Sequence, residues 1–191
     1  AIRKLERIAL KNLENSLRML KHNVFSDIHF YRFSSRLIPL ANHEVLKDWN
    51  YIKPLEVALH EIGEFVQKHK MRIDFHPDHF VLINSGKKDV LENAVITLDM
   101  HHQLLTHMGI NPVHRCVIHV GGKYKAKEKS LERFIDNWNH VPPHTQSMLM
   151  LENDDTSFTL EDTLYLCEQL SIPLVFDYHH HLAHQKNPNW V

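Results

Sequence analysis

The sequence is poor in glycine and cysteine, and it has no long apolar run. Its 191 residues include 5 Gly, 8 Pro and 2 Cys. So few Gly and Pro exclude collagen-like and linker-rich chains, and two Cys cannot form a disulfide framework. No apolar stretch approaches the roughly 20 residues of a membrane span, and the N-terminus lacks the pattern of a secretory signal. We therefore expect a cytoplasmic protein in a reducing environment, with no membrane partner.

Neither sign of charge is in excess. Lys and Arg number 22 against 23 Asp and Glu, for a net charge of −1. This balance excludes a polybasic nucleic-acid tail, although it leaves room for a local basic groove. Histidine, in contrast, is abundant, with 18 residues, and many of them lie beside Asp, Glu or Pro at the ends of apolar runs. Because histidine is the commonest metal-binding side chain, the composition favours metal chemistry.

Helical and strand-like segments alternate along the chain. Helices are predicted over residues 3–22, 54–70, 87–108, 127–139 and 159–170. Strands are predicted over residues 27–34, 72–77, 115–120, 147–152 and 172–177. Residues 185–191 show no periodicity and are predicted to form a loop. Strands and helices that alternate, with almost continuously apolar strands, are typical of a parallel sheet with right-handed crossovers.

The parallel sheet could be an open doubly wound sheet or a closed barrel. The chain contains no G-x-G-x-x-G fingerprint, and its one glycine pair, Gly121-Gly122, lacks the third glycine of that motif. We therefore predict an α/β fold of the (β/α)8 TIM-barrel type. A full barrel takes about 250 residues, so this chain covers roughly five to six β/α units. No composition shift marks a boundary, which predicts a single, partial barrel domain over residues 1–191.

Polar side chains follow the predicted strands one after another. They are His43 in the loop after the first strand, then His76, His119, Glu152, and Asp177 with His179, His180 and His181. Taken singly, each histidine is more often a turn or core residue than a ligand. In a barrel, however, all these strand ends share the face on which active sites form. Imidazoles mixed with carboxylates suit Mn²⁺, Fe²⁺ or Zn²⁺, so the repetition predicts a metal site.

Other polar residues have mainly structural interpretations. Arg72 and Asp74 share a strand face with His76 and are expected to support it or to form an ion pair. The histidines inside predicted helices, such as His101, are expected to be solvated or at the core edge. The basic run over residues 123–133 is broken by two Glu, which favours a solvated helix start. Because this run follows the glycine pair on the functional face, a phosphate contact is the alternative.

Six motifs, in order, resemble one known family. They are YRFSS at 31–35, PLANH at 39–43, FHP at 75–77, IHVGG at 118–122, LENDD at 151–155 and FDYHH at 176–180. Together they resemble UV damage endonuclease, a family of TIM-barrel DNA repair nucleases, over residues 1–185. Any one motif is weak, whereas the combination is specific. The resemblance implies that the family's first strand and last β/α units lie outside this chain.

The resemblance implies a metal-dependent endonuclease that nicks the DNA backbone on the 5′ side of UV photolesions. It also implies two or three divalent metal ions, Mn²⁺ first among them, with some ligands supplied by the C-terminal units. The implied ligands are His43, His76, His119, Glu152, Asp177 and His180; of these, Glu152, His119, Asp177 and His180 are the implied catalytic residues. Strand alternation alone would select His179, so His180 is implied by the resemblance only.

The family also probes its lesion with two residues that follow the His-Pro pair. Here they are His79, where the family usually has Gln, and Phe80, which keeps the stacking function. Tyr124, with the flanking Lys123 and Lys125, is a further expected DNA contact, although Lys125 replaces a common glycine. The implied partner is damaged double-stranded DNA, and we expect a monomer.

Two other functions fit the same residues. One is a divalent-metal sugar or sugar-phosphate isomerase or epimerase on the same barrel, and the other is a catalytically incomplete metal-binding protein. The order of the motifs and the aromatic Phe80 near the ligands favour base stacking over binding of sugar hydroxyls. A steep salt dependence of binding would distinguish DNA from a neutral sugar.

Overall fold

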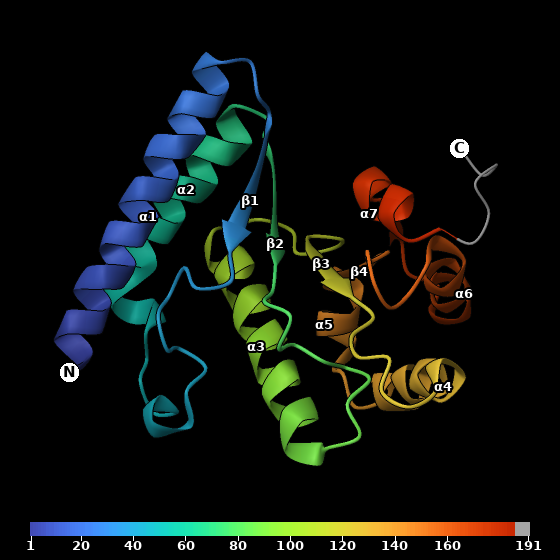
Figure 1. Ribbon diagram of the computed structural model, residues 1–191. Coiled ribbons are helices and arrows are strands. Elements are labelled where there is room, and N and C mark those ends of the chain that lie inside the picture. Colours follow the sequence, from blue (N-terminus) through green and yellow to red (C-terminus); the bar gives the residue numbers. More distant parts are fainter. Residues whose placement is uncertain (186–191) are drawn as a thin grey trace. The chain divides into compact units, whose positions relative to one another are not determined.

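The computed structural model describes residues 1–185, in which strands and helices alternate (Figure 1). The loop predicted over residues 185–191 lies outside the described residues, except for Gln185. The chain forms two compact units. Unit one comprises residues 1–76 and 99–112, and unit two comprises residues 77–98 and those from 113 onward. Across the described residues, no helix is both long and apolar enough to span a membrane.

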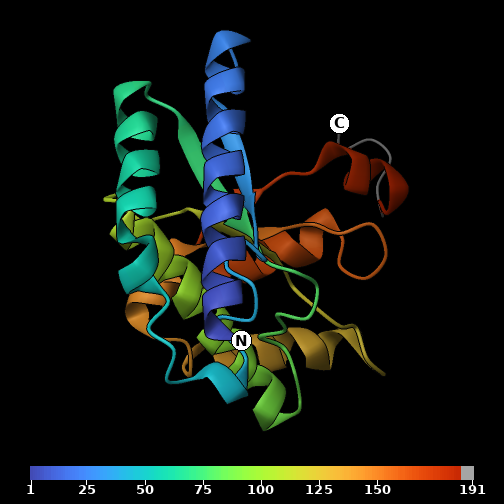
Figure 2. The ribbon, with the colours of Figure 1, turned by 90° about the vertical axis from the view of Figure 1, so that its left-hand side faces the viewer.

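Unit one is built from two long helices and a pair of strands. Its elements are α1 (Ile2–Phe25), β1 (Phe30–Ser34), the 3-10 helix η1 (Glu44–Leu46), α2 (Ile52–Lys68) and β2 (Arg72–His76), followed by the second half of α3 (Lys88–His107). Strands β1 and β2 pair in parallel, with Ser34 opposite His76. Helices α1 and α2 run side by side (Figures 1 and 2). The short helix η1 was not predicted.

The core of unit one follows from the helical periodicity. One face of α1 buries Leu13 and Leu20, and one face of α2 buries Leu59. Each such side chain contributes about 1.5–3 kcal/mol when it leaves water. In the strands, Phe33 stacks on Phe75 with ring centroids 5.4 Å apart. This packing fixes β1 and β2 in register, and with them the position of the strand ends.

Unit two supplies the other three strands. Its elements are the first half of α3, then β3 (Cys116–His119), α4 (Lys127–Trp138), α5 (Pro143–Met148), β4 (Leu149–Glu152), α6 (Leu160–Leu170), β5 (Leu174–Val175) and α7 (Tyr178–Ala183). Strands β3 and β4 pair in parallel with His119 opposite Glu152, and β4 pairs in parallel with β5. The predicted order of strands and helices is therefore confirmed.

Several predicted boundaries are wrong for local reasons. The strand predicted from residue 147 begins at Leu149. The preceding residues form helix α5, which ends at Met148 and begins at Pro143, a position where proline is well tolerated. The strand predicted over 172–177 is reduced to Leu174–Val175, because Asp177 caps the unpredicted helix α7. His101 was expected at the core edge but is fully buried, with its ring 4.6 Å from that of Phe75.

Helix α6, predicted to begin at Thr159, begins with a capping box. The Asp162 carboxylate accepts a hydrogen bond from the Thr159 main-chain N–H at 2.9 Å, and the Thr159 hydroxyl accepts one from the Asp162 N–H. The Lys127 ammonium lies 2.6 Å from the same carboxylate and ties α4 to α6. Lys127 therefore has a structural role. The basic run was expected to be exposed to solvent, and Lys127 departs from that expectation.

We expect Asp162→Asn to reduce stability in a pH-dependent way. Burial alone would raise the pKa of Asp162, but hydrogen bonds from Lys127 and Thr159 outweigh it, and the pKa lies below its ordinary value. The carboxylate's contribution is therefore present above the unfolded pKa of about 3.9 and is lost as the pH falls through the folded pKa. At pH 7 the substitution should cost about 1.5–3 kcal/mol of unfolding free energy.

Urea unfolding at pH 7 and at pH 3 measures this effect. The difference between Asp162→Asn and wild type should shrink at pH 3. The matched control is Glu168→Gln, on an exposed position of the same helix, which should change stability by less than about 0.5 kcal/mol. An equal loss at both pH values would contradict the assignment.

Candidate metal centre

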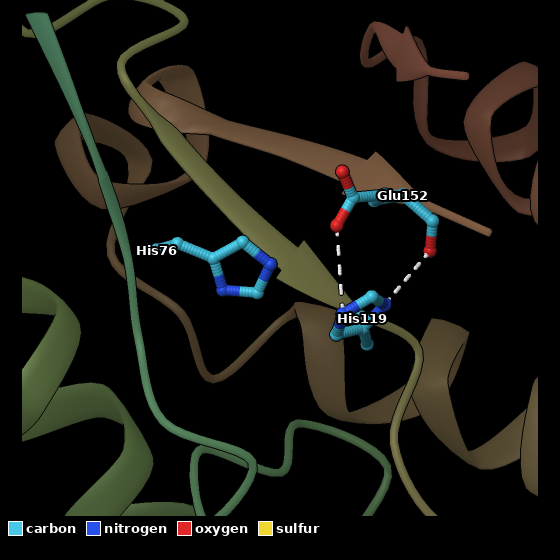
Figure 3. A group of neighbouring side chains, drawn as sticks. All are labelled: His76, His119 and Glu152. Carbon is cyan, nitrogen blue, oxygen red and sulfur yellow. Dashed lines mark hydrogen bonds and ion pairs between the residues drawn. The ribbon is translucent and has the colours of Figure 1, made fainter. Parts of the chain in front are cut away.

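The strand register places His119 beside Glu152 at the C-terminal ends of β3 and β4. The His119 Nε2 atom lies 3.5 Å from Glu152 Oε2, and His119 Nδ1 lies 3.4 Å from the Glu152 main-chain oxygen (Figure 3). The Glu152 side chain is buried, whereas about 29% of the His119 side chain is exposed. A buried carboxylate beside an imidazole is a donor pair that suits a borderline divalent cation.

The geometry of the pair fits a divalent cation. A neutral imidazole carries one N–H. When that hydrogen is on His119 Nδ1, which faces a carbonyl oxygen, the lone pair of Nε2 faces the Glu152 carboxylate. A proton or a metal ion bound by both atoms would stabilise this arrangement. Two donor atoms about 2.1 Å from an ion lie about 3.0 Å apart in an octahedral site and about 3.4 Å apart in a tetrahedral one, so a small closing of the observed 3.5 Å would bring both atoms onto one ion.

A buried amide, Asn153, positions two more of the predicted site residues. Its Nδ2 donates to the Asp177 carbonyl and its Oδ1 accepts from the Asp177 N–H, both at 2.9 Å. The Asn153 carbonyl oxygen lies 2.9 Å from His180 Nδ1. With Nδ1 engaged in this way, Nε2 is the ring atom of His180 that can bind a metal. Sequence reasoning missed Asn153, although it stands inside the LENDD motif.

Asp177 and His180 belong to the start of α7. The Asp177 carboxylate caps this helix by accepting the His180 N–H at 2.8 Å, and this hydrogen bond is the main cause that lowers the pKa of Asp177. The His180 ring centroid lies 5.5 Å from that of His119. His179 is exposed. Alternation selected His179 because it assumed a strand, whereas the chain turns into a helix at Asp177.

A cavity of about 390 Å³ opens beside these side chains in unit two. It is lined by His119 and His180 together with His79, from the loop after β2. Phe80, the other predicted lesion-probing residue, is 67% exposed, and its ring centroid lies 4.0 Å from that of His79. The structure therefore brings one predicted probing residue and two predicted ligands to the same cavity.

The remaining predicted ligands belong to unit one. His76 is the half-buried last residue of β2 and is also labelled in Figure 3. His43 is exposed and caps η1, where its Nδ1 accepts the Val45 N–H at 3.2 Å. The partner of Asp74 is Arg32 of the neighbouring strand, at 3.0 Å, rather than Arg72. The parallel register aligns Arg32 with Asp74, a pairing that sequence alone does not reveal.

Parallel strands whose C-terminal ends carry imidazole and carboxylate groups are typical of enzymes with a (β/α) barrel. The family model described as UV-endonuclease UvdE matches residues 1–190, and the chain belongs to this family. A UV DNA damage endonuclease of Halalkalibacterium halodurans is 53% identical over 180 residues, which are 94% of this chain and 56% of the relative. One of Bacillus mycoides is 40% identical over 184 residues, with coverages of 96% and 58%.

Solved structures give the same result for the fold. The crystal structure of SacUVDE has a TM-score of 0.90 and 33% identity, covering 99% of this chain and 65% of that one. D-psicose 3-epimerase of Clostridium cellulolyticum H10 has a TM-score of 0.62 at 10% identity over 89% of this chain and 60% of that one, which is a likeness of fold alone. The predicted partial TIM barrel and the resemblance to UV damage endonuclease are confirmed. The chain spans about half the length of its curated relatives.

Proposed function

We propose that the protein acts as a metal-dependent DNA repair endonuclease that nicks the backbone on the 5′ side of UV photolesions in double-stranded DNA. The observation that carries this proposal is the pairing of His119 with Glu152 at two strand ends, beside a cavity that His119 lines together with His79. Membership of the UvdE family supports the same activity. We further propose a cytoplasmic monomer that forms one partial barrel domain over residues 1–191.

The proposed ligands of the metal centre come from successive strand ends. They are His43, His76, His119, Glu152, Asp177 and His180. The support for this set is that each residue ends a parallel strand or follows one, and such positions meet on one face of a barrel. The donor set of imidazoles and carboxylates suits Mn²⁺. We propose two or three ions, with further ligands from residues that the longer relatives contain and this chain does not.

The residues of the chain prepare this site in distinct ways. When bound, divalent ions activate water and stabilise the charge that develops as a phosphodiester is hydrolysed. Glu152 places a buried negative charge beside His119, and main-chain carbonyls fix the ring orientation of His119 and His180. Phe80 and His79 are proposed to fill the gap left by a displaced base. Stacking on an aromatic ring contributes about 1–3 kcal/mol per base, and displacement costs least at a poorly stacked lesion.

Nicking of supercoiled plasmid tests the proposed activity. Irradiated and unirradiated plasmid are incubated with the protein in Mn²⁺ or in EDTA, and nicked circles are separated on a gel. We expect nicking of irradiated plasmid only, and only with Mn²⁺. A longer product of the same gene is assayed in parallel, and nicking by that product alone would show that residues outside this chain are required. If neither product nicks irradiated DNA, the endonuclease proposal fails and sugar epimerisation becomes the next assay.

A further inference from the structure

A second cavity in unit two is lined by positive charge. Its volume is about 680 Å³, and it lies between the loop after β2 and the loop after β3. Four cations line it: Lys87, Lys125, Lys129 and Arg133. No Asp or Glu is among the described residues that line it, and within residues 1–185 none of the four forms an ion pair with a carboxylate. Concentrated, uncompensated positive charge favours an anionic ligand.

Two side-chain amides, one buried and one half-buried, connect the walls of this basic cavity. Asn84 is fully buried; its Nδ2 donates to the Gly122 carbonyl at 2.8 Å, and its Oδ1 accepts the Gly122 N–H at 3.2 Å. Asn137 of α4 donates to the carbonyls of Ile83 and Ser85 at 2.7 and 2.9 Å. The cavity is therefore preformed, and a ligand would not have to order its walls.

An aromatic ring holds Arg133 in the wall of the basic cavity. The Arg133 guanidinium lies 5.2 Å from the Tyr124 ring centroid, within range of a cation–π interaction. Tyr124 has φ of 49°, a left-handed conformation that is rare for a bulky residue. Its ring packs on Gly122, where a Cβ would approach the ring to 3.0 Å. A planar guanidinium fixed in this way matches the oxygens of a phosphate.

The basic cavity adjoins the cavity of the metal centre, because Leu82 lines both. Each DNA strand carries one phosphate per 3.4 Å or so of helix rise, so a backbone at the first cavity presents further phosphates nearby. We propose that the basic cavity binds a backbone phosphate that flanks the nicked bond, through Lys125, Lys129 and Arg133. The identity of the ligand as DNA rests on the proposed function, whereas the preference for a phosphate rests on the cavity itself.

The salt dependence of DNA binding tests this inference without the metal. Fluorescence anisotropy measures binding of the protein to a labelled, undamaged duplex in EDTA over a series of KCl concentrations. A plot of log K against log [salt] has a negative slope, and each lost phosphate contact makes that slope less steep by about one. We expect Lys125→Gln combined with Lys129→Gln to make the slope less steep by about one, because both lysines serve the same phosphate. The matched control is Lys88→Gln, which removes an exposed charge that pairs with Glu92 outside the basic cavity.

The outcomes separate this inference from the proposed function. A slope unchanged in the double variant, an equal reduction in the control, or no binding by wild type would overturn the inference. His119→Ala should keep the wild-type slope in EDTA, because it removes no phosphate contact. If photolesions are not nicked but the double variant still reduces the slope, the phosphate site stands and the proposed function fails. If photolesions are nicked and the double variant has an unchanged slope, the proposed function stands and the phosphate site fails.

Discussion

His119→Ala and Glu152→Ala are each expected to abolish divalent-metal binding at the main site while the fold is retained. His119 Nε2 and Glu152 Oε2 lie 3.5 Å apart, so each variant removes one of two adjacent proposed ligands. Loss of a group that merely orients a ligand costs about 10–100-fold in metal affinity, and loss of a ligand should exceed about 100-fold. Metal content after dialysis and Mn²⁺ titration by calorimetry measure the effect, and circular dichroism verifies folding.

A pair of neighbouring histidines provides the matched control. His180 has its Nδ1 held by the Asn153 carbonyl and its ring near His119, whereas His179 is exposed. His180→Ala should weaken Mn²⁺ binding, and His179→Ala should not. Unchanged metal content in both the His119 and the Glu152 variants would refute the ligand assignment. Equal losses from His179→Ala and His180→Ala would contradict the geometry at the start of α7.

The parts of the fold that sequence predicts well are those with local signals. The capping box of Thr159 and Asp162 places the start of α6, because both hydrogen bonds join residues three apart. Strand β2 ends at His76, one residue before the end of the predicted range, because Pro77 cannot donate to the ladder. Cys116 and Cys167 lie within apolar segments and are buried, and burial raises the pKa of the Cys167 thiol to about 11.

The parts that sequence predicts poorly depend on contacts between distant residues. Asp74 could be seen on the face of a strand, but its partner Arg32 is set by the register of β1 against β2. Lys127 looks like one of several surface lysines until α4 packs near α6 and the ion pair with Asp162 forms. His76, His119 and Glu152 each end a strand as the hydrophobic pattern predicted, whereas His180 lies in α7.

Two buried asparagines form hydrogen bonds between segments that are distant in the sequence. Such connections are harder to predict than the candidate ligands at the strand ends. Asn153 connects the end of β4 to the residues that follow β5, and Asn84 connects the loop after β2 to the loop after β3. Asparagine in a loop ordinarily indicates a turn, so neither residue carries a distinctive sequence signal. Both act by satisfying main-chain groups of another segment of the chain.

Gly121→Ala is expected to lower the free energy of unfolding by about 3–5 kcal/mol. The cost of backbone strain and the cost of losing two buried hydrogen bonds both contribute to this loss. Gly121 has φ of 113°, a conformation that L-residues rarely adopt. A Cβ there would also overlap the buried Asn84 Oδ1 and would approach Leu82 Cδ2 to 3.1 Å. Moving Asn84 breaks its two hydrogen bonds to Gly122 and leaves a buried amide unsatisfied. Urea unfolding in EDTA measures the loss.

The control is the same substitution in the neighbouring loop. A Cβ on Gly86 meets only the Arg133 side chain, at 3.8 Å or more, so Gly86→Ala should leave stability unchanged or raise it by up to about 1 kcal/mol. Asn84→Gly combined with Gly121→Ala removes the overlap but keeps the strained φ, and the double variant should lose less than the sum of the single losses. Strict additivity would show that Gly121 and Asn84 do not meet. Because Gly121 follows His119 by two residues, Gly121→Ala should also weaken Mn²⁺ binding, and Gly86→Ala should not.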